Sequence, residues 1–225
     1  MPGVLSLVAS AVVVTFALGV WKVVGFARKV QTYRHTAKSG AQDAPPGFRI
    51  LGATAQRAQE LQWFVIDDQV MGGRSQSALD MSEGKIKFAG VINTTGGGFS
   101  NCRTLGDSEP LGIPSTAKAM AVTAIGDGRQ YKLTLHTADS WAMSVPAWAH
   151  DFWTNPPGQR QTFQLPLDKF VPSKQGRALQ GLTLDPSEVT GVGLSLSLKT
   201  MDGRPNPHFG DGPFSLTLEG LEVIP

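Results

Sequence analysis

The chain has 225 residues, of which 41% are hydrophobic and 17% charged, and this composition disfavours a disordered chain and a coiled coil. Its 26 glycines and 15 prolines favour many short strands over a helical bundle. The single cysteine, Cys102, excludes an intrachain disulfide and a cysteine-based zinc site. Residues 1–42 hold five basic and no acidic residues, so the rest of the chain is slightly acidic. Such a domain lacks the positive field that nucleic acid requires, and we expect no nucleic-acid partner.

The chain begins with an apolar run. No charge occurs from Val4 to Trp21, and the run continues to Phe26 if Lys22 extends its amine to the interface. About 23 such residues predict one transmembrane helix. Because the basic residues follow it, the rest of the chain should lie on the positive-inside face of the membrane. We therefore expect residues 1–35 to form an anchor with a basic flank.

Three other interpretations of this segment remain open. A cleaved secretory signal would place its basic residues before the apolar run rather than after it. An organellar transit peptide would be equally basic and free of acidic residues, but amphipathic. A buried helix of a soluble core would rarely be apolar on every face.

Residues 36–50 predict a linker, because they are small, polar and proline-containing. A short helix is expected near residues 53–61. From residue 51 to residue 225 we expect one β-sandwich domain of about nine or ten strands, of the jelly-roll type. Apolar and polar residues alternate with a period of two, separated by Gly- and Pro-rich turns, in the segments Ile86–Phe88, Tyr131–His136, Phe163–Leu167, Val192–Leu198 and Phe214–Glu219.

Residues with catalytic potential are few. The four histidines, His35, His136, His150 and His208, lack metal-ligand spacing. Asp67 and Asp68 are neighbours, so on a strand they would point to opposite faces, and one of them is expected to cap the turn that follows. Cys102 lies in an alternating segment and is expected to be buried. We predict no catalytic, cofactor-binding or metal-binding residue, which indicates binding rather than catalysis.

Several segments together resemble the complex I intermediate-associated protein 30 family. The most specific is WFVIDDQVMGGRSQS, with its Asp-Asp pair and V-M-G-G-x-S run. Leu167 departs from the family pattern, since phenylalanine is common at that place. The matching segments are Trp63–Ser77, Gly97–Thr104, Gly126–Lys132, Phe152–Gly176, Val192–Leu198 and Gly212–Ile224.

The resemblance implies a galactose-binding-domain-like sandwich and a non-enzymatic factor that binds assembly intermediates of respiratory complex I. It implies protein subunits as partners, and with the predicted span it implies the mitochondrial inner membrane, facing the matrix. A bacterial inner membrane or a plastid are alternatives, and so is a photosynthetic complex as client. A carbohydrate- or other ligand-binding module is a further alternative, based on fold analogy alone.

The motif residues are the candidates for partner binding. Arg103 and Arg129 follow Gly-rich turns and could pair with Asp67, Asp68 or Asp127, or the same loops could grip a partner. Among the aromatics Trp141, Trp148, Phe152 and Trp153, we expect Phe152 and Trp153 in the core and Trp148 partly exposed. The full candidate set is Asp67, Asp68, Met71, Gly72, Gly73, Arg74, Ser75, Arg103, Asp127, Arg129 and Trp148.

Overall fold

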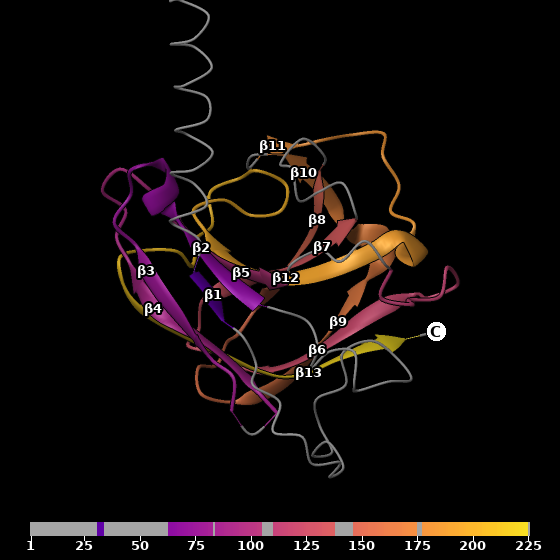
Figure 1. Cartoon of the computed structure of the whole chain (residues 1–225), viewed down its shortest axis with the longest axis horizontal. Helices are drawn as coiled ribbons and strands as arrows, with labels where there is room; N and C mark the ends of the chain where they lie inside the picture. Colours follow the sequence, from indigo (N-terminus) through magenta and orange to yellow (C-terminus); the bar gives the residue numbers. More distant parts are fainter. Residues whose placement is uncertain are drawn as a thin grey trace, which may run out of the picture. The chain divides into compact units, whose positions relative to one another are not determined.

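The computed structural model places two β-sheets face to face. In Figure 1 most strands of the first sheet lie above those of the second. The neighbouring strands from β2 onward pair antiparallel in both sheets, which confirms the expected β-sandwich. The structure describes residues 31–33, 63–82, 84–104, 110–137, 146–174 and 177–224.

The first sheet has eight strands and the second has five. In spatial order the first contains β1 (Gln31–Tyr33), β2 (Trp63–Asp67), β5 (Phe99–Thr104), β12 (Val189–Ser197), β7 (Gln130–Thr137), β8 (Ala147–Trp153), β10 (Val171–Lys174) and β11 (Arg177–Ala178). The second contains β3 (Gln76–Asp80), β4 (Ile86–Ile92), β13 (Gly212–Ile224), β6 (Ala119–Ile125) and β9 (Arg160–Pro166). Three short 3-10 helices are η1 (Asp68–Met71), η3 (Leu167–Lys169) and η4 (Pro186–Glu188).

The core lies between the two sheets and is built by the alternation seen in the sequence. Every second residue of the central strands is buried in one hydrophobic cluster, as Leu133 and Leu135 of β7 and Leu194 and Leu196 of β12 show. Cys102 of β5 is also in this cluster and fully buried, as expected. Burial raises the pKa of its thiol, so it is a packing residue rather than a nucleophile.

The predicted strand count was too low. Twelve strands lie between residues 63 and 224 of the described ranges. The polar segment of β3 and the short strands β10 and β11 lack a clear apolar alternation, which explains why they were missed. Leu167 does not continue the strand that precedes it, because it begins η3 after Pro166, and proline has no N–H for the ladder.

The predicted span at residues 4–26, the linker at 36–50, the helix at 53–61 and His35 lie outside the described residues. Within the described residues, the structure contains no helix with the length and apolar character of a membrane span.

Candidate functional site

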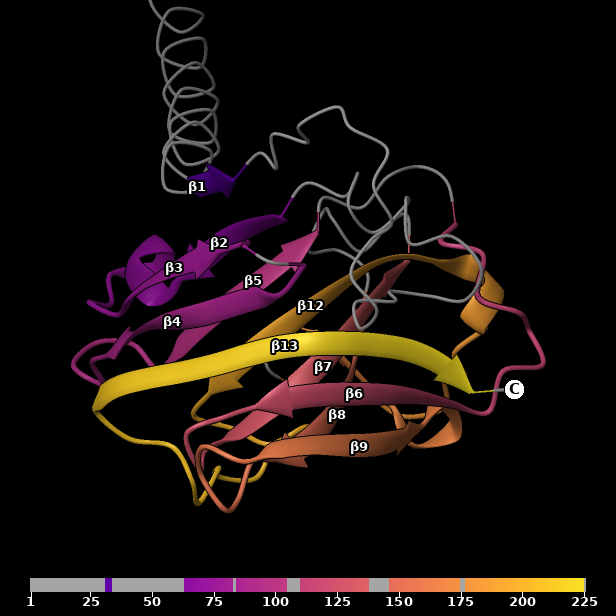
Figure 2. The same ribbon diagram turned by 90° about the horizontal axis from the view of Figure 1, so that it is seen from below.

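Five loops meet at one end of the sandwich, on the left-hand side of Figure 2. We call residues 68–75, 93–98, 126–129, 154–158 and 198–212 the loop end. Backbone hydrogen bonds join its loops: Leu198 N–H donates to the Gly98 carbonyl (2.9 Å), and Gly158 N–H to the Gly126 carbonyl (2.8 Å). Thr94 N–H donates to Asp211 Oδ1 (2.6 Å). These hydrogen bonds therefore connect the loops to one another.

Asp67, the last residue of β2, ties the two sheets together at the loop end. Its carboxylate accepts from Ser77 N–H (2.8 Å) and Ser77 Oγ–H (2.7 Å) on the second sheet. It also accepts from Ser100 Oγ–H (2.6 Å) on the first sheet. Burial raises the pKa of Asp67, and these hydrogen bonds partly oppose the rise. The adjacent carboxylates diverge, as the sequence predicted.

Asp68 is fully buried and holds the V-M-G-G-x-S turn closed. Its carboxylate accepts from Ser75 N–H (2.8 Å) and Ser75 Oγ–H (2.7 Å), so it stabilises the turn as predicted. Gly72 has φ +96°, which favours glycine. A Cβ added to Gly73 or Gly97 would collide with the Asp68 side chain, so both positions must be glycine for the loops to close around this carboxylate.

Asp127 and Arg129 fix the opposite part of the loop end. Asp127 accepts from the Tyr131 hydroxyl (3.0 Å) and from Ser215 N–H (3.0 Å). Arg129 forms an ion pair with Asp127 (Nε–Oδ2, 3.5 Å) and donates to the Gly210 carbonyl (2.7 Å). The predicted pairing of Arg129 with an aspartate is therefore confirmed.

The corresponding prediction for Arg103 was wrong. Asp67 and Asp68 bind serines, whereas the Arg103 guanidinium lies over the Phe64 ring, 5.3 Å from its centroid. The reason is strand alternation: Cys102 points into the core, so Arg103 points to the outer face of the first sheet.

The loop end carries a row of exposed apolar side chains. The strands β2, β12 and β8 run in the same direction, and Met71, Leu198 and Trp153 lie at or just beyond their carboxyl ends. These strands are two positions apart in the sheet, so their carboxyl ends are spaced by about 10 Å. Met71 is 77% exposed and Trp153 45%. Val91 is exposed nearby on β4, where it pairs with Pro213.

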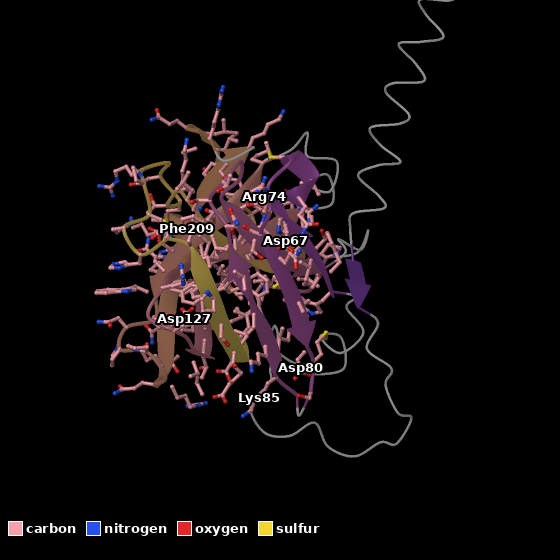
Figure 3. All side chains as sticks on the ribbon, turned by 90° about the vertical axis from the view of Figure 1, so that its left-hand side faces the viewer. Asp67, Arg74, Asp80, Lys85, Asp127 and Phe209 are labelled. Atoms are coloured by element: carbon pink, nitrogen blue, oxygen red, sulfur yellow. The ribbon has the colours of Figure 1, made fainter. Side chains whose placement is uncertain are left out.

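This clustering is not a general property of the surface. Five large hydrophobic side chains are exposed in the described residues, and only Leu182 lies away from the loop end. Figure 3 shows Asp67 and Arg74 in the upper part of the view, with Phe209 of the 198–212 loop to their left and Asp127 below it. Asp80 and Lys85, at the other end of β3 and β4, lie at its lower edge. Concentrated apolar exposure on a rigid loop cluster is typical of a protein-interaction surface.

The predicted exposure of two tryptophans was reversed. Trp148 is only 7% exposed and belongs to the core, together with Phe152, whose burial was predicted correctly. Trp153 has the opposite phase on β8 and is exposed, with its Nε1–H donating to the Gly128 carbonyl (2.9 Å) and its ring stacked on His208. The phase of β8 would have shown this, since residues 148 and 152 share a face and residue 153 does not. Trp141 lies outside the described residues.

The loop end has no sign of a metal centre. Across the residues that the structure describes, no three histidine, cysteine, aspartate or glutamate side chains are placed to hold an ion. The polar groups that meet at the loop end are hydrogen-bonded to one another and stabilise the loops. The exposed side chains of the loop end include the apolar Met71 and Leu198 and the charged Arg74, Lys199 and Arg204.

Comparison with solved structures gives distant likenesses. A family 11 carbohydrate-binding module from Clostridium thermocellum is 13% identical over 70% of this chain and 87% of its own length, with a TM-score of 0.41. An agarase, AgWH50C, is 11% identical with a TM-score of 0.43, and the match covers 68% of this chain and 22% of the agarase. The structure called PfGH50B is 10% identical with a TM-score of 0.44, over 67% of this chain and 22% of that protein.

No curated protein matches this chain in sequence. A family model does match, over residues 53–218, which is most of the chain and includes every loop of the loop end. That model describes complex I intermediate-associated protein 30. The match confirms the resemblance carried by the Asp-Asp and V-M-G-G-x-S motifs, and the chain belongs to the complex I intermediate-associated protein 30 family.

Proposed function

We propose that this protein is a non-enzymatic assembly factor that binds an intermediate of a membrane protein complex, with respiratory complex I as the client. Membership of the family supports the role. The single structural observation that supports it best is the row of Met71, Leu198 and Trp153 on a hydrogen-bonded loop end. These side chains are exposed here and would be buried in a complex.

The rigidity of the loop end would favour binding. A surface that is ordered before it meets a partner loses less conformational entropy on association. Asp68 holds the turn that presents Met71, and the Gly98 carbonyl holds the backbone of Leu198. A few exposed apolar anchors of this kind commonly carry most of the affinity of an interface.

The N-terminal segment would add a tether. In this proposal residues 4–26 cross the membrane once and place the sandwich on the positive-inside face, which in a mitochondrion is the matrix. Tethering confines the loop end to the plane where hydrophobic subunits are inserted and raises its effective concentration without new contacts. We include in the proposal that the sandwich has the galactose-binding-domain-like, jelly-roll topology of the family.

The experiment is native-gel separation of gently solubilised membranes from cells that express the C-terminally tagged chain, followed by mass spectrometry of each slice. The expected result is co-migration with subcomplexes of complex I and absence from the mature enzyme. Co-migration with a photosynthetic complex would change the client. Migration alone would contradict the proposal.

A variant pair tests whether the loop end is the contact surface. The double variant Met71→Ser with Leu198→Ser should lose co-migration while its abundance stays normal, because both side chains are exposed and contribute little to the core. Leu182→Ser is the matched control, since Leu182 is equally apolar and exposed but lies away from the loop end. Equal behaviour of the two variants would exclude the loop end as the docking surface.

A further inference from the structure

The second sheet ends in a strand whose outer backbone edge is unpaired. β9 pairs with β6 on one side, and no described strand follows it on the other. Figure 2 shows β9 at this edge of the sheet. With seven residues it is the longest edge strand in the described part of the chain, since β3 has five, β1 three and β11 two. β9 therefore offers more free backbone than any other sheet edge that the structure describes.

Two observations show which backbone groups of β9 point away from the sheet. In an antiparallel pair, every second residue exchanges hydrogen bonds with the neighbouring strand, and the residues between them face outward. Leu167 N–H, just beyond β9, donates to the Lys118 carbonyl (2.9 Å), and this pair continues the register of β9 with β6. Pro166 has no N–H and occupies the alternate position, as proline does on an edge. The N–H and C=O groups of Thr162 and Gln164 therefore point outward.

These outward groups are unused, whereas the edge of β3 is closed. Thr162 and Gln164 are exposed, and among the described residues their backbone groups have no hydrogen-bond partner on the open side. On β3, by contrast, Ser77 N–H donates to Asp67 Oδ2 (2.8 Å), so a carboxylate occupies the middle of that edge. Charged groups placed in this way keep a strand from pairing with another chain. The second sheet therefore has one protected edge and one open edge.

β9 has few of the features that protect an edge. Its register with β6 runs from Arg160 to Pro166 without a bulge. Its one charged side chain, Arg160, lies at one end and forms an ion pair with Glu219 of β13 (Nε–Oε2, 2.8 Å). Pro166 lies at the other end, and residues 161–165 between them are uncharged. A regular, uncharged edge of this kind is suited to pairing with another strand.

The residue pattern of β9 is complementary to itself. When two copies pair antiparallel about Phe163, Thr162 of one copy lies opposite Gln164 of the other, so their outward groups exchange hydrogen bonds. Arg160 then lies opposite Pro166, and no like charges face each other. Phe163 is partly exposed where it packs against the core, and it would lie opposite Phe163 of the second copy. Aromatic pairs across antiparallel strands stabilise a sheet.

We propose that β9 is a homodimer interface, in which two copies of the chain pair antiparallel through this strand, centred on Phe163, and join their second sheets into one. The arrangement is isologous, since each strand gives the other the same groups that it receives. Because the two strands run in opposite directions, the two loop ends point away from each other and both stay free for a client. The interface uses none of the exposed apolar side chains of the loop end, so it goes beyond the proposed function and does not depend on it.

Cysteine cross-linking of the full chain in gently solubilised membranes tests the register. Chains with Thr162→Cys mixed with chains with Gln164→Cys should form a disulfide-linked dimer under mild oxidation, because opposite residues of the pair have Cα atoms about 5.5 Å apart. Each variant alone should form none, since its two cysteines would be about 9 Å apart. Cys102 is buried and should give no background. Absence of the dimer in the mixture, a cross-link of either variant with itself, or a cross-link to another protein only would overturn the proposal, the last in favour of a client strand.

A charge comparison separates pairing from folding. Thr162→Lys with Gln164→Lys would place like charges opposite each other twice, so we expect the dimer to weaken by about tenfold or more. Thr162→Lys with Gln164→Glu is the matched control, because the introduced charges attract and the dimer should be retained. Both positions are exposed, so both variants should fold. Sedimentation of the detergent-solubilised chain at about 1–100 µM measures the dimer. Equal dissociation of the two variants, or a monomeric wild type throughout this range, would contradict the assignment.

Discussion

At the loop end the carboxylates of half-buried Asp67 and fully buried Asp68 accept hydrogen bonds from serines. On the outer face of the first sheet, Asn101 and Asp151 each have a buried oxygen that accepts no hydrogen bond among the described residues. In the first region these two carboxylates are used internally, and the apolar side chains of Met71, Leu198 and Trp153 are left exposed. In the second region, buried oxygens of Asn101 and Asp151 accept no hydrogen bond from the described residues.

The largest effect should come from Asp68→Ala. This change removes two hydrogen bonds to a charged acceptor and leaves Ser75 N–H and Oγ buried without them, so we expect the free energy of unfolding to fall by about 3–4 kcal/mol. Denaturant unfolding of the full chain measures it. Asp80→Ala, at an exposed position of β3, should change stability by less than about 0.5 kcal/mol. A mild effect at position 68 would mean that the turn does not depend on its carboxylate.

Gly97→Ala should be the next most damaging change. Its Cβ would meet the Asp68 side chain, so either the carboxylate or the loop has to move, at a cost of about 1–3 kcal/mol. Gly210→Ala is the control within the same loop end, because its Cβ has open space within 4 Å. If both variants unfold at the same denaturant concentration, the loops do not close around Asp68 as described.

His136 provides a pH test of the outer face. Burial, with some repulsion from Arg103, lowers its pKa from 6.5 to about 3, so the unfolded chain binds a proton more readily than the folded one. This contribution to stability is complete above pH 6.5 and is lost as the pH falls from there towards 3, by about 1.4 kcal/mol per pH unit. Replacement by Gln should flatten that slope, measured by unfolding at a series of pH values.

The two regions also differ in how well the sequence predicts them. The fold followed from period-two alternation, because a half-buried strand needs only one apolar face. The turn that Asp68 holds closed could be predicted, because Asp68 and Ser75 are close in sequence. The exposed apolar surface of the loop end could not be predicted. Leu198 continues the apolar pattern of β12 and differs only because it lies one residue beyond the end of the strand. Its exposure depends on where the sandwich ends.

The alignment of polar side chains on the outer face of the first sheet could not be predicted from the sequence for a different reason. Asn101, Lys132, Asp151 and Ser195 come from four strands separated by up to 94 positions, and only the register brings them together. Their alternation with core residues predicts a solvent face. Burial of polar atoms on that face depends on tertiary packing, which no local pattern shows. The predicted exposures of Trp148 and Trp153 were reversed because the sequence analysis did not assign a strand at β8. Without the strand, the face on which each of its residues lies was also unknown.

The smallest effect should come from the titration of Asp67, and it sharpens the contrast with Asn101. Burial raises its pKa above 3.8, but the hydrogen bonds from Ser77 and Ser100 stabilise the charged form and limit the rise. The folded chain therefore binds a proton more readily than the unfolded one, and stability falls as the pH rises from 3.8 through the folded pKa. Relative to Asp67→Asn, the wild type should be favoured most below pH 3.8 and lose that advantage towards neutral pH. A wild-type advantage that grows with pH would mean that the serines stabilise the carboxylate more than burial destabilises it, and that Asp67 contributes its charge as well as its geometry to the loop end.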